Sequence, residues 1–168
     1  MKSLITALAL LPFASSALAG PGHGAAHGIG EPGDPAKVDR VVEIAMDEMS
    51  YSPASVEVAA GETIRFVVSN EGRLVHEFNL GTPDSWATHE DEMQAMMREG
   101  MMSMRRVDHE KMQEMGMAHD DPNSLLLEPG ESAEIVWTFP EDGQVGYACN
   151  VPGHLEAGMK GKVALEAG

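Results

Sequence analysis

One cysteine, one histidine and one methionine follow each other at fixed spacing near the carboxyl end of the sequence. Cys149, His154 and Met159 stand in "YACNVPGHLEAGMKGKV" as C-x4-H-x4-M, and Cys149 is the only cysteine. A single cysteine cannot form an internal disulfide, so it is an unprotected thiol, half of an intermolecular bridge or a metal ligand. The spacing favours the ligand, because thiolate, imidazole and thioether all bind soft metal ions.

A fourth candidate ligand, His76, belongs to the earlier segment "LVHEF". This segment is expected to be a strand whose end faces the segment around Cys149. Two imidazoles and one thiolate in a plane, with a long axial thioether, are the ligands of a mononuclear copper site that transfers electrons. Taken singly, each histidine could be an ordinary partly buried side chain and Met159 could belong to the core. The four ligand types together indicate copper.

Short strands must position these four residues. From residue 38 onward, runs such as "SVEVAAGETIRFVVSNEG" alternate apolar and polar residues, and a second series follows residue 122. Turn signals recur at "AAGE", "NEG", "EPGE" and "PEDG". About seven short strands in this pattern predict an antiparallel β-sandwich.

The chain resembles the cupredoxins, which are small blue or green copper proteins. The resemblance rests on "NEGRLVHEF" and "GYACNVPGHLEAGMKGKV", and it covers residues 38–80 and 124–166. It implies an all-β Greek-key sandwich of eight or nearly eight strands with a type 1 copper site at one end. Cupredoxins often have Asn or Ser after the first histidine ligand, whereas this chain has Glu77. Because groups around the thiolate tune the metal, this departure leaves the spectroscopic class and the reduction potential open.

Residues 82–121 form a different segment between the two series of strands. Thr88, with Asp91 three residues later, is expected to begin a helix, and a second short helix is expected over residues 107–115. The whole chain is therefore predicted to be a β-sandwich with an α-helical, Met-rich insertion at 82–121.

The methionines of this insertion are candidate copper ligands. Nine of them lie between positions 93 and 117, with no Leu, Ile, Phe, Tyr or Trp among them. A face chosen for burial alone would be expected to contain Leu, and thioethers suit Cu(I), so we predict weak or transient Cu(I) binding. Packing in a core or against a partner is the alternative. The candidate secondary ligands are Met93, Met96, Met97, Met101, Met102, Met104, Met112, Met115, Met117, His89, His109 and His119.

The amino-terminal sequence predicts export. Residues 1–19 read as a signal peptide that is cleaved near Gly20, which places the mature protein in the bacterial periplasm. Residues 20–37 are expected to be a flexible leader in which His23 and His27 either capture metal or belong to a plain tail. Residues 38–168 are expected to form one cupredoxin domain that includes the insertion.

The charge of the mature chain limits its partners. It carries 27 acidic residues, and all but one of the 11 basic residues lie after the signal peptide. This balance excludes nucleic acid, and it favours cations or a basic protein partner, with solubility alone as the alternative. No membrane span is expected in the mature chain.

Three classes of function follow from these residues. A multicopper oxidase or a copper nitrite reductase needs further histidine clusters such as H-x-H, which the sequence lacks. The enzyme class is therefore not expected beyond a weak cuprous-oxidising activity. A copper-tolerance protein that binds and oxidises Cu(I) is favoured over a plain electron-transfer carrier, because a carrier has no need of surplus thioethers. The expected partners are copper ions and a redox or copper-handling protein.

Overall fold

The computed structural model describes residues 28–118 and 121–166. The predicted signal peptide, the first part of the predicted leader with His23 and His27, and the candidate ligand His119 lie outside the described residues.

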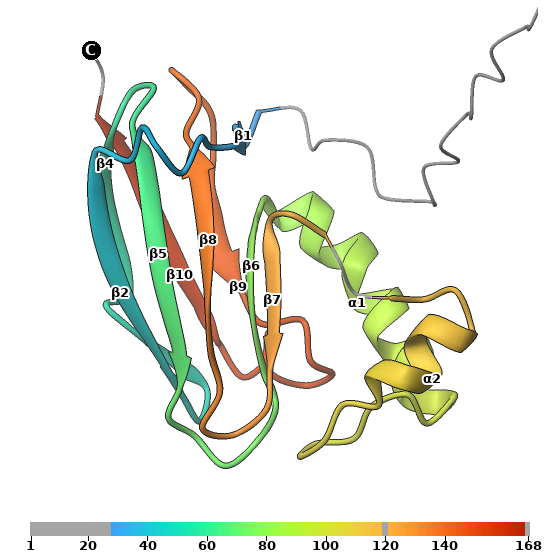
Figure 1. Cartoon of the computed structure of the whole chain (residues 1–168). Coiled ribbons are helices and arrows are strands. Elements are labelled where there is room, and N and C mark those ends of the chain that lie inside the picture. Colours follow the sequence, from blue (N-terminus) through green and yellow to red (C-terminus); the bar gives the residue numbers. More distant parts are fainter. Residues whose placement is uncertain (1–27, 119–120, 167–168) are drawn as a thin grey trace, which may run out of the picture.

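Two five-stranded sheets pack face to face in the described part of the chain (Figure 1). The first has the order β1-β8-β5-β2-β3 and the second has the order β4-β10-β9-β6-β7. The predicted all-β sandwich with a helical insertion is confirmed. The strands are β1 (Glu31–Pro32), β2 (Arg40–Asp47), β3 (Ser50–Ser52), β4 (Ser55–Ala59), β5 (Thr63–Asn70), β6 (His76–Gly81), β7 (Ser124–Leu127), β8 (Ser132–Thr138), β9 (Gly146–Ala148) and β10 (Lys160–Glu166).

The prediction of purely antiparallel sheets is wrong for two pairs of strands. β2 pairs with β5 in parallel, and β4 pairs with β10 in parallel. Two strands separated by a crossing to the other sheet can return in the same direction, and an alternating residue pattern is identical for both directions. The sequence pattern therefore identifies the strands but does not identify their neighbours.

An aromatic cluster fills the core behind the strands that carry the candidate ligands. The ring centroids of Phe78 and Tyr147 lie 5.2 Å apart, and those of Tyr51 and Tyr147 lie 5.0 Å apart. Phe66 packs on Phe78 at 5.4 Å from the opposite sheet. The hydroxyl of Tyr51 donates a hydrogen bond to the backbone carbonyl of Glu77 at 2.6 Å, so the cluster also fixes the start of β6.

Part of the predicted leader belongs to the sandwich. Ile29 is 1% exposed, and its carbonyl accepts a hydrogen bond of 2.7 Å from Trp137 Nε1. β1 then pairs with β8. One buried apolar side chain and a few backbone hydrogen bonds thus attach residues 29–33 of this Gly- and Pro-rich segment to a sheet edge, and the flexibility expected of residues 20–37 stays a prediction.

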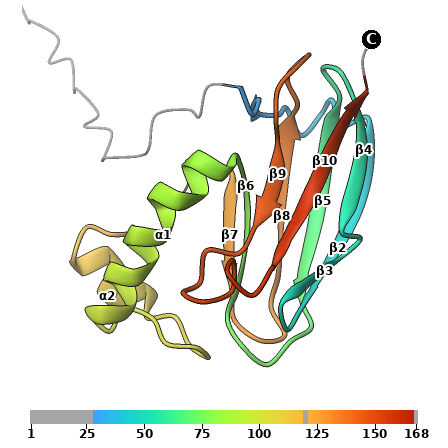
Figure 2. The ribbon, with the colours of Figure 1, turned by 180° about the vertical axis from the view of Figure 1, so that it is seen from behind.

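The insertion contains two helices, α1 (Pro83–Arg98) and α2 (His109–Glu114), which lie together beside β6 and β7 (Figures 1 and 2). α2 falls within the predicted second helix. The predicted start of the first helix at Thr88 is wrong, because Thr82 is the N-cap and forms a capping box with Ser85. The sequence "TPDS" contains the signals for this earlier start, with Pro at the first helical position and an acidic residue in the first turn.

Trp86 attaches α1 to the second sheet at a pair of glycines. Gly81 of β6 and Gly146 of β9 are register partners, and each leaves room for the indole ring. A Cβ atom on Gly81 would lie 2.5 Å from Trp86 Nε1, and one on Gly146 would lie 3.0 Å from Trp86 Cη2. The helix therefore approaches the sheet closely only because these two positions carry no side chain.

Gly81→Ala is expected to destabilise the fold, because the added methyl group overlaps the indole of Trp86. We expect a loss of about 1–3 kcal/mol in the free energy of unfolding, measured by urea denaturation of the apo-protein. In a Trp86→Phe background the smaller ring leaves more room, so the same substitution should cost less. Equal costs in the two backgrounds would contradict this packing account.

Candidate metal centre

Neighbouring strands and one loop position the four predicted copper ligands. His76 begins β6, and Cys149 directly follows β9, which pairs with β6. His154 and Met159 lie in the loop that leads from Cys149 to β10. All four side chains are buried, with His154 at 1% exposure and the others at 0%.

The donor atoms of three of these residues converge. Cys149 Sγ lies 3.3 Å from His154 Nδ1 and 4.0 Å from His76 Nδ1. Backbone hydrogen bonds close the loop, from the Cys149 amide to the Met159 carbonyl at 3.1 Å and from the Met159 amide to the His154 carbonyl at 3.0 Å. Met159 is thereby held, buried, beside the other three residues. Two imidazoles, a thiol and a thioether in one water-excluded pocket fit a copper ion.

The second nitrogen of each histidine ring, Nε2, is consistent with the same orientation. The Nε2 atoms of His76 and His154 are buried without a hydrogen-bond partner among the described residues. His76 Nε2 lies 3.9 Å from the nearest carboxylate oxygen of Glu48. The Nδ1 atoms therefore face the cysteine sulfur, as a ligand set requires.

Burial keeps these donors uncharged without a metal. It raises the pKa of the Cys149 thiol to about 12, and it lowers the pKa of His154 to about 4, helped by the neighbouring His76 ring. The pKa of His76 is also lowered, mainly by burial. The neutral imidazoles are ready to bind a cation, and binding must displace the thiol proton.

Two polar residues that the sequence analysis did not single out hold the loop before His76. The Asn70 side-chain amide donates to the carbonyls of Leu74 and Leu127 at 2.8 and 2.9 Å, and its oxygen accepts from the Gly72 amide at 3.0 Å. The Glu48 carboxylate accepts from the amides of Arg73 and Leu74. Asn70 stands in the turn signal "SNEG", whereas nothing in the sequence around Glu48 indicates its role.

Glu77, the residue that departs from the cupredoxin pattern, contacts the cysteine segment twice. Its amide donates to Cys149 Sγ at 3.3 Å, and its carboxylate accepts from the Asn150 amide at 3.0 Å. The same carboxylate is 0% exposed and also accepts from the hydroxyl of Ser124 at 2.7 Å. A buried carboxylate needs such donors, because an uncompensated charge is costly in the protein interior.

His89 of α1 provides a further donor to Glu77. Its Nε2 lies 2.9 Å from Glu77 Oε1, and its Nδ1 lies 3.1 Å from Glu92 Oε2. Burial lowers the pKa of His89, but the two carboxylates outweigh burial and raise it to about 9. His89 is therefore a cation at neutral pH with both ring nitrogens engaged, and it would have to leave these carboxylates to bind Cu(I).

The insertion's thioethers form much of its interior. Five of the nine methionines are buried, two are partly buried, and Met104 and Met115 are 37% and 47% exposed. Packing in a core, which the sequence left open as the alternative, therefore describes the five buried methionines. Cu(I) binding by these methionines stays a prediction. The candidate ligand His109 is exposed at the start of α2. The buried set is Met93, Met96, Met101, Met102 and Met112, and the partly buried pair is Met97 and Met117.

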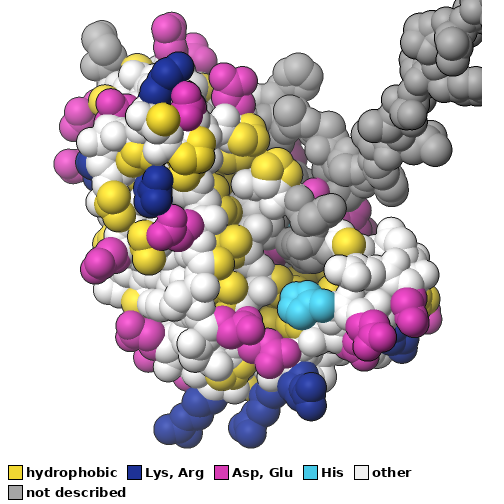
Figure 3. Space-filling model, viewed as in Figure 1, with side chains coloured by type: hydrophobic (Ala, Val, Ile, Leu, Met, Phe, Trp, Pro, Cys, Tyr) yellow, Lys and Arg dark blue, Asp and Glu magenta, His cyan; other side chains and the backbone are white. Residues whose placement is uncertain are grey.

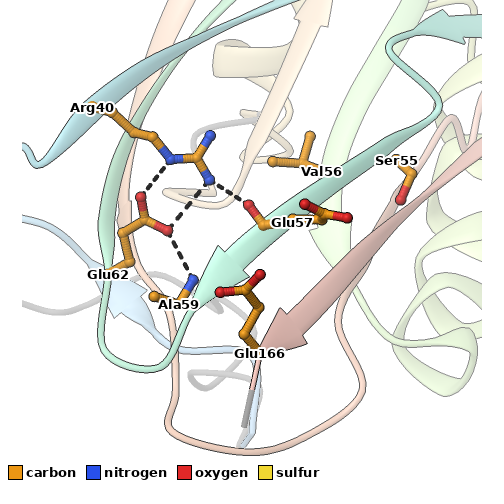
Figure 4. A pocket seen from close by; sticks show the side chains of 7 residues that line it. All are labelled: Arg40, Ser55, Val56, Glu57, Ala59, Glu62 and Glu166. Carbon is orange, nitrogen blue, oxygen red and sulfur yellow. Dashed lines mark hydrogen bonds and ion pairs between the residues drawn. The ribbon is translucent and has the colours of Figure 1, made fainter. Parts of the chain in front are cut away.

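A hollow at the other end of the sandwich has different chemistry (Figure 4). Arg40 forms an ion pair with Glu62 there and donates to the backbone carbonyl of Glu57, with Glu166 beside it. No cysteine, histidine or methionine lines this hollow. Arg40, Glu62 and the backbone groups of Glu57 and Ala59 satisfy one another there.

Acidic side chains are spread over the molecular face seen in Figure 3, whereas several Lys and Arg side chains gather at its lower end. Figure 1, in the same view, has the loop between β5 and β6 at that end. None of the helices in the described ranges is long and apolar enough to cross a membrane.

The fold and the donor set agree with the comparison to known families. The profile described as "Copper binding proteins, plastocyanin/azurin family" matches residues 38–166. The chain belongs to this family and is a copper-binding cupredoxin.

Particular relatives extend the comparison. The chain is similar to the "Copper-resistant cuproprotein CopI" of Pseudomonas aeruginosa, with 45% identity over 92% of this chain and 90% of the relative. It is 40% identical to the protein of the same description from Rubrivivax gelatinosus, over 97% of this chain and 94% of the relative. The solved structure of auracyanin B is similar in fold, with a TM-score of 0.59, 23% identity and coverage of 82% of this chain and 96% of that chain.

The charge on His89 predicts a pH-dependent stability. Its folded-state pKa of about 9 lies above the ordinary value of 6.5, so the stabilisation is full below about pH 6.5 and is lost as the pH rises through about 9. Glu77 and Glu92 are the carboxylates that face it.

We expect the free energy of unfolding of the apo-protein to fall by on the order of 2 kcal/mol over this range, measured by urea denaturation. His89→Gln, which carries no titrating ring, should show a flatter profile. An unchanged pH profile in that variant would contradict the assignment.

Proposed function

We propose that this protein acts in copper resistance in the periplasm and that His76, Cys149, His154 and Met159 hold copper in a type 1 site. The observation that carries the proposal is the convergence of Cys149 Sγ with the Nδ1 atoms of both histidines in a buried pocket. The relatives described as copper-resistant cuproproteins support the biological role. The predicted signal peptide supports export.

The residues of this pocket suit a redox-active ion. Copper held by His76, Cys149, His154 and Met159 would supply one-electron chemistry, in which oxidation of one Cu(I) ion delivered nearby reduces the Cu(II) that they hold to Cu(I). The Cys149 thiolate and the Met159 thioether favour the cuprous state, while the imidazoles of His76 and His154 bind both states. Burial of all four side chains excludes water from the pocket.

We propose that the insertion binds Cu(I). Thioethers bind Cu(I) without needing to lose a proton, and the acidic surface attracts cations. The insertion also reaches the copper centre, because the Met104 carbonyl accepts a 2.8 Å hydrogen bond from the amide of Val75, the residue before His76. The partly exposed thioether of Met104 therefore lies on a loop that is attached to a ligand strand.

A plain electron-transfer carrier is less well supported. Such a carrier needs a histidine edge that a redox partner can approach. Here His76 is 0% exposed and His154 is 1% exposed. Both ligand histidines are thus buried, and the insertion carries thioethers that an electron carrier does not need.

Cys149→Ser should abolish the visible colour of the Cu(II)-loaded protein, because a hydroxyl cannot replace the soft, covalent thiolate. Met159→Leu should keep the colour and change the reduction potential, because the axial thioether is the weakest of the four ligands. Absorption spectra and redox titration of both variants test this. Colour that survives in the Cys149→Ser variant would overturn the site.

Replacing six insertion methionines with leucine should lower the number of Cu(I) equivalents bound and keep the Cu(II) colour. Leucine retains volume and apolar character, at a usual cost below about 1.5 kcal/mol per site, and removes the sulfur. Cu(I) titration with a competing chelator and survival of copper-stressed cells provide the measurements. Unchanged stoichiometry and unchanged protection would assign these residues to packing or docking. The set is Met93, Met96, Met97, Met101, Met102 and Met104.

A further inference from the structure

We propose that His89 is a positioning residue for the copper centre, and that it acts through the Glu77 carboxylate to hold the backbone amide of Asn150, directly after Cys149. Helix α1 of the insertion thereby helps to set the geometry of the copper–thiolate bond. This inference rests on the proposed type 1 site.

The first step is the contact between Glu77 and the cysteine segment. The Glu77 amide donates to Cys149 Sγ at 3.3 Å, and its carboxylate oxygen Oε2 accepts from the amide of Asn150 at 3.0 Å. One residue thus contacts both the sulfur and the peptide that follows it. A movement of Glu77 would shift the sulfur relative to the two imidazoles.

The second step is the compensation of the Glu77 charge. Its side chain is 0% exposed, and the hydroxyl of Ser124 and the amide of Asn150 are neutral donors. His89 adds a donor at 2.9 Å that carries positive charge. Removing His89 takes away this 2.9 Å contact and destabilises the buried pair, so the Glu77 carboxylate would rotate from its present position. That movement weakens its hold on the Asn150 amide.

The third step is a second contact between α1 and the same segment. The Asn150 side-chain amide donates to the carbonyl of Trp86 at 2.9 Å. Trp86 and His89 are three residues apart, which places them on one face of the helix. Asn150 is therefore held by α1 directly through Trp86 and indirectly through His89 and Glu77.

The experiment compares Cu(II)-loaded and apo forms of four single variants and one double variant of the full chain. His89→Leu removes both donors, and His89→Gln keeps one neutral donor. Glu77→Gln removes the charge on which His89 acts. Gln113→Leu is the matched control, because Gln113 is an exposed polar residue of the same insertion, is no candidate copper ligand, and has no contact to Glu77 among the described interactions.

We expect His89→Leu to weaken Cu(II) binding by about 10-fold or more and to shift the thiolate-to-copper absorption bands, since groups behind metal ligands commonly have effects of this size. In the apo-protein, hydrogen exchange at the Asn150 amide should become faster. His89→Gln should give an intermediate result, and Gln113→Leu should match the parent. In a Glu77→Gln background, His89→Leu should add little further change, because the two residues act in one chain of contacts.

Parent-like affinity, absorption and Asn150 exchange in His89→Leu would overturn the proposal. An equally large effect of His89→Leu in the Glu77→Gln background would also overturn it, because His89 would then act by another route. If His89→Leu does not fold, as judged by circular dichroism, His89→Gln decides by the same three measurements. Loss of colour in Cys149→Ser tests the copper site independently, so a failed inference can be distinguished from a failed site.

Discussion

The pairing of β6 with β9 is the interaction on which the copper centre depends. His76 begins one of these strands and Cys149 follows the other, so the register of Asn79 with Ala148 determines how close the two side chains come. A shift by one residue would turn alternate side chains to the opposite face and separate the ligands. The aromatic cluster around Tyr147 and Phe78 packs behind these strands and makes such a shift costly. The rest of the sandwich supports this one register.

The insertion is part of the same arrangement. It leaves the sheet after Gly81 and returns at Ser124. In between it contacts the ligand region, because it accepts hydrogen bonds from Asn150 and Val75 and donates one from His89 to Glu77. A helix added only for storage of a soft metal would not need these contacts. The charged pair of Glu77 and His89 is the clearest sign that the sandwich and the insertion are one unit, since neither residue is well placed in the interior without the other.

The sequence indicates which residues come together at the candidate site because the spacing of three of them is local. Cys149, His154 and Met159 lie within one short stretch of sequence. The segment "LVHEF" marks the strand that carries His76. The roles of Glu77 and His89 could not be predicted, because they depend on which face of α1 meets the sheet. The parallel strand pairs could not be predicted for a similar reason, since an alternating pattern identifies a strand but not its direction. The start of α1 differs, because Thr82 and Pro83 form a stronger signal for a helix start than Thr88 does.

The burial of the insertion's methionines also has a consequence for chemical damage. Oxidation of a thioether yields a sulfoxide, a polar group that a packed interior does not accommodate. The five buried sulfurs are shielded from dissolved oxidants, whereas Met104 and Met115 are 37% and 47% exposed. Redox cycling of copper produces such oxidants, so these two side chains would be modified first. The buried methionines of the insertion would then stay unoxidised for as long as α1 and α2 remain packed.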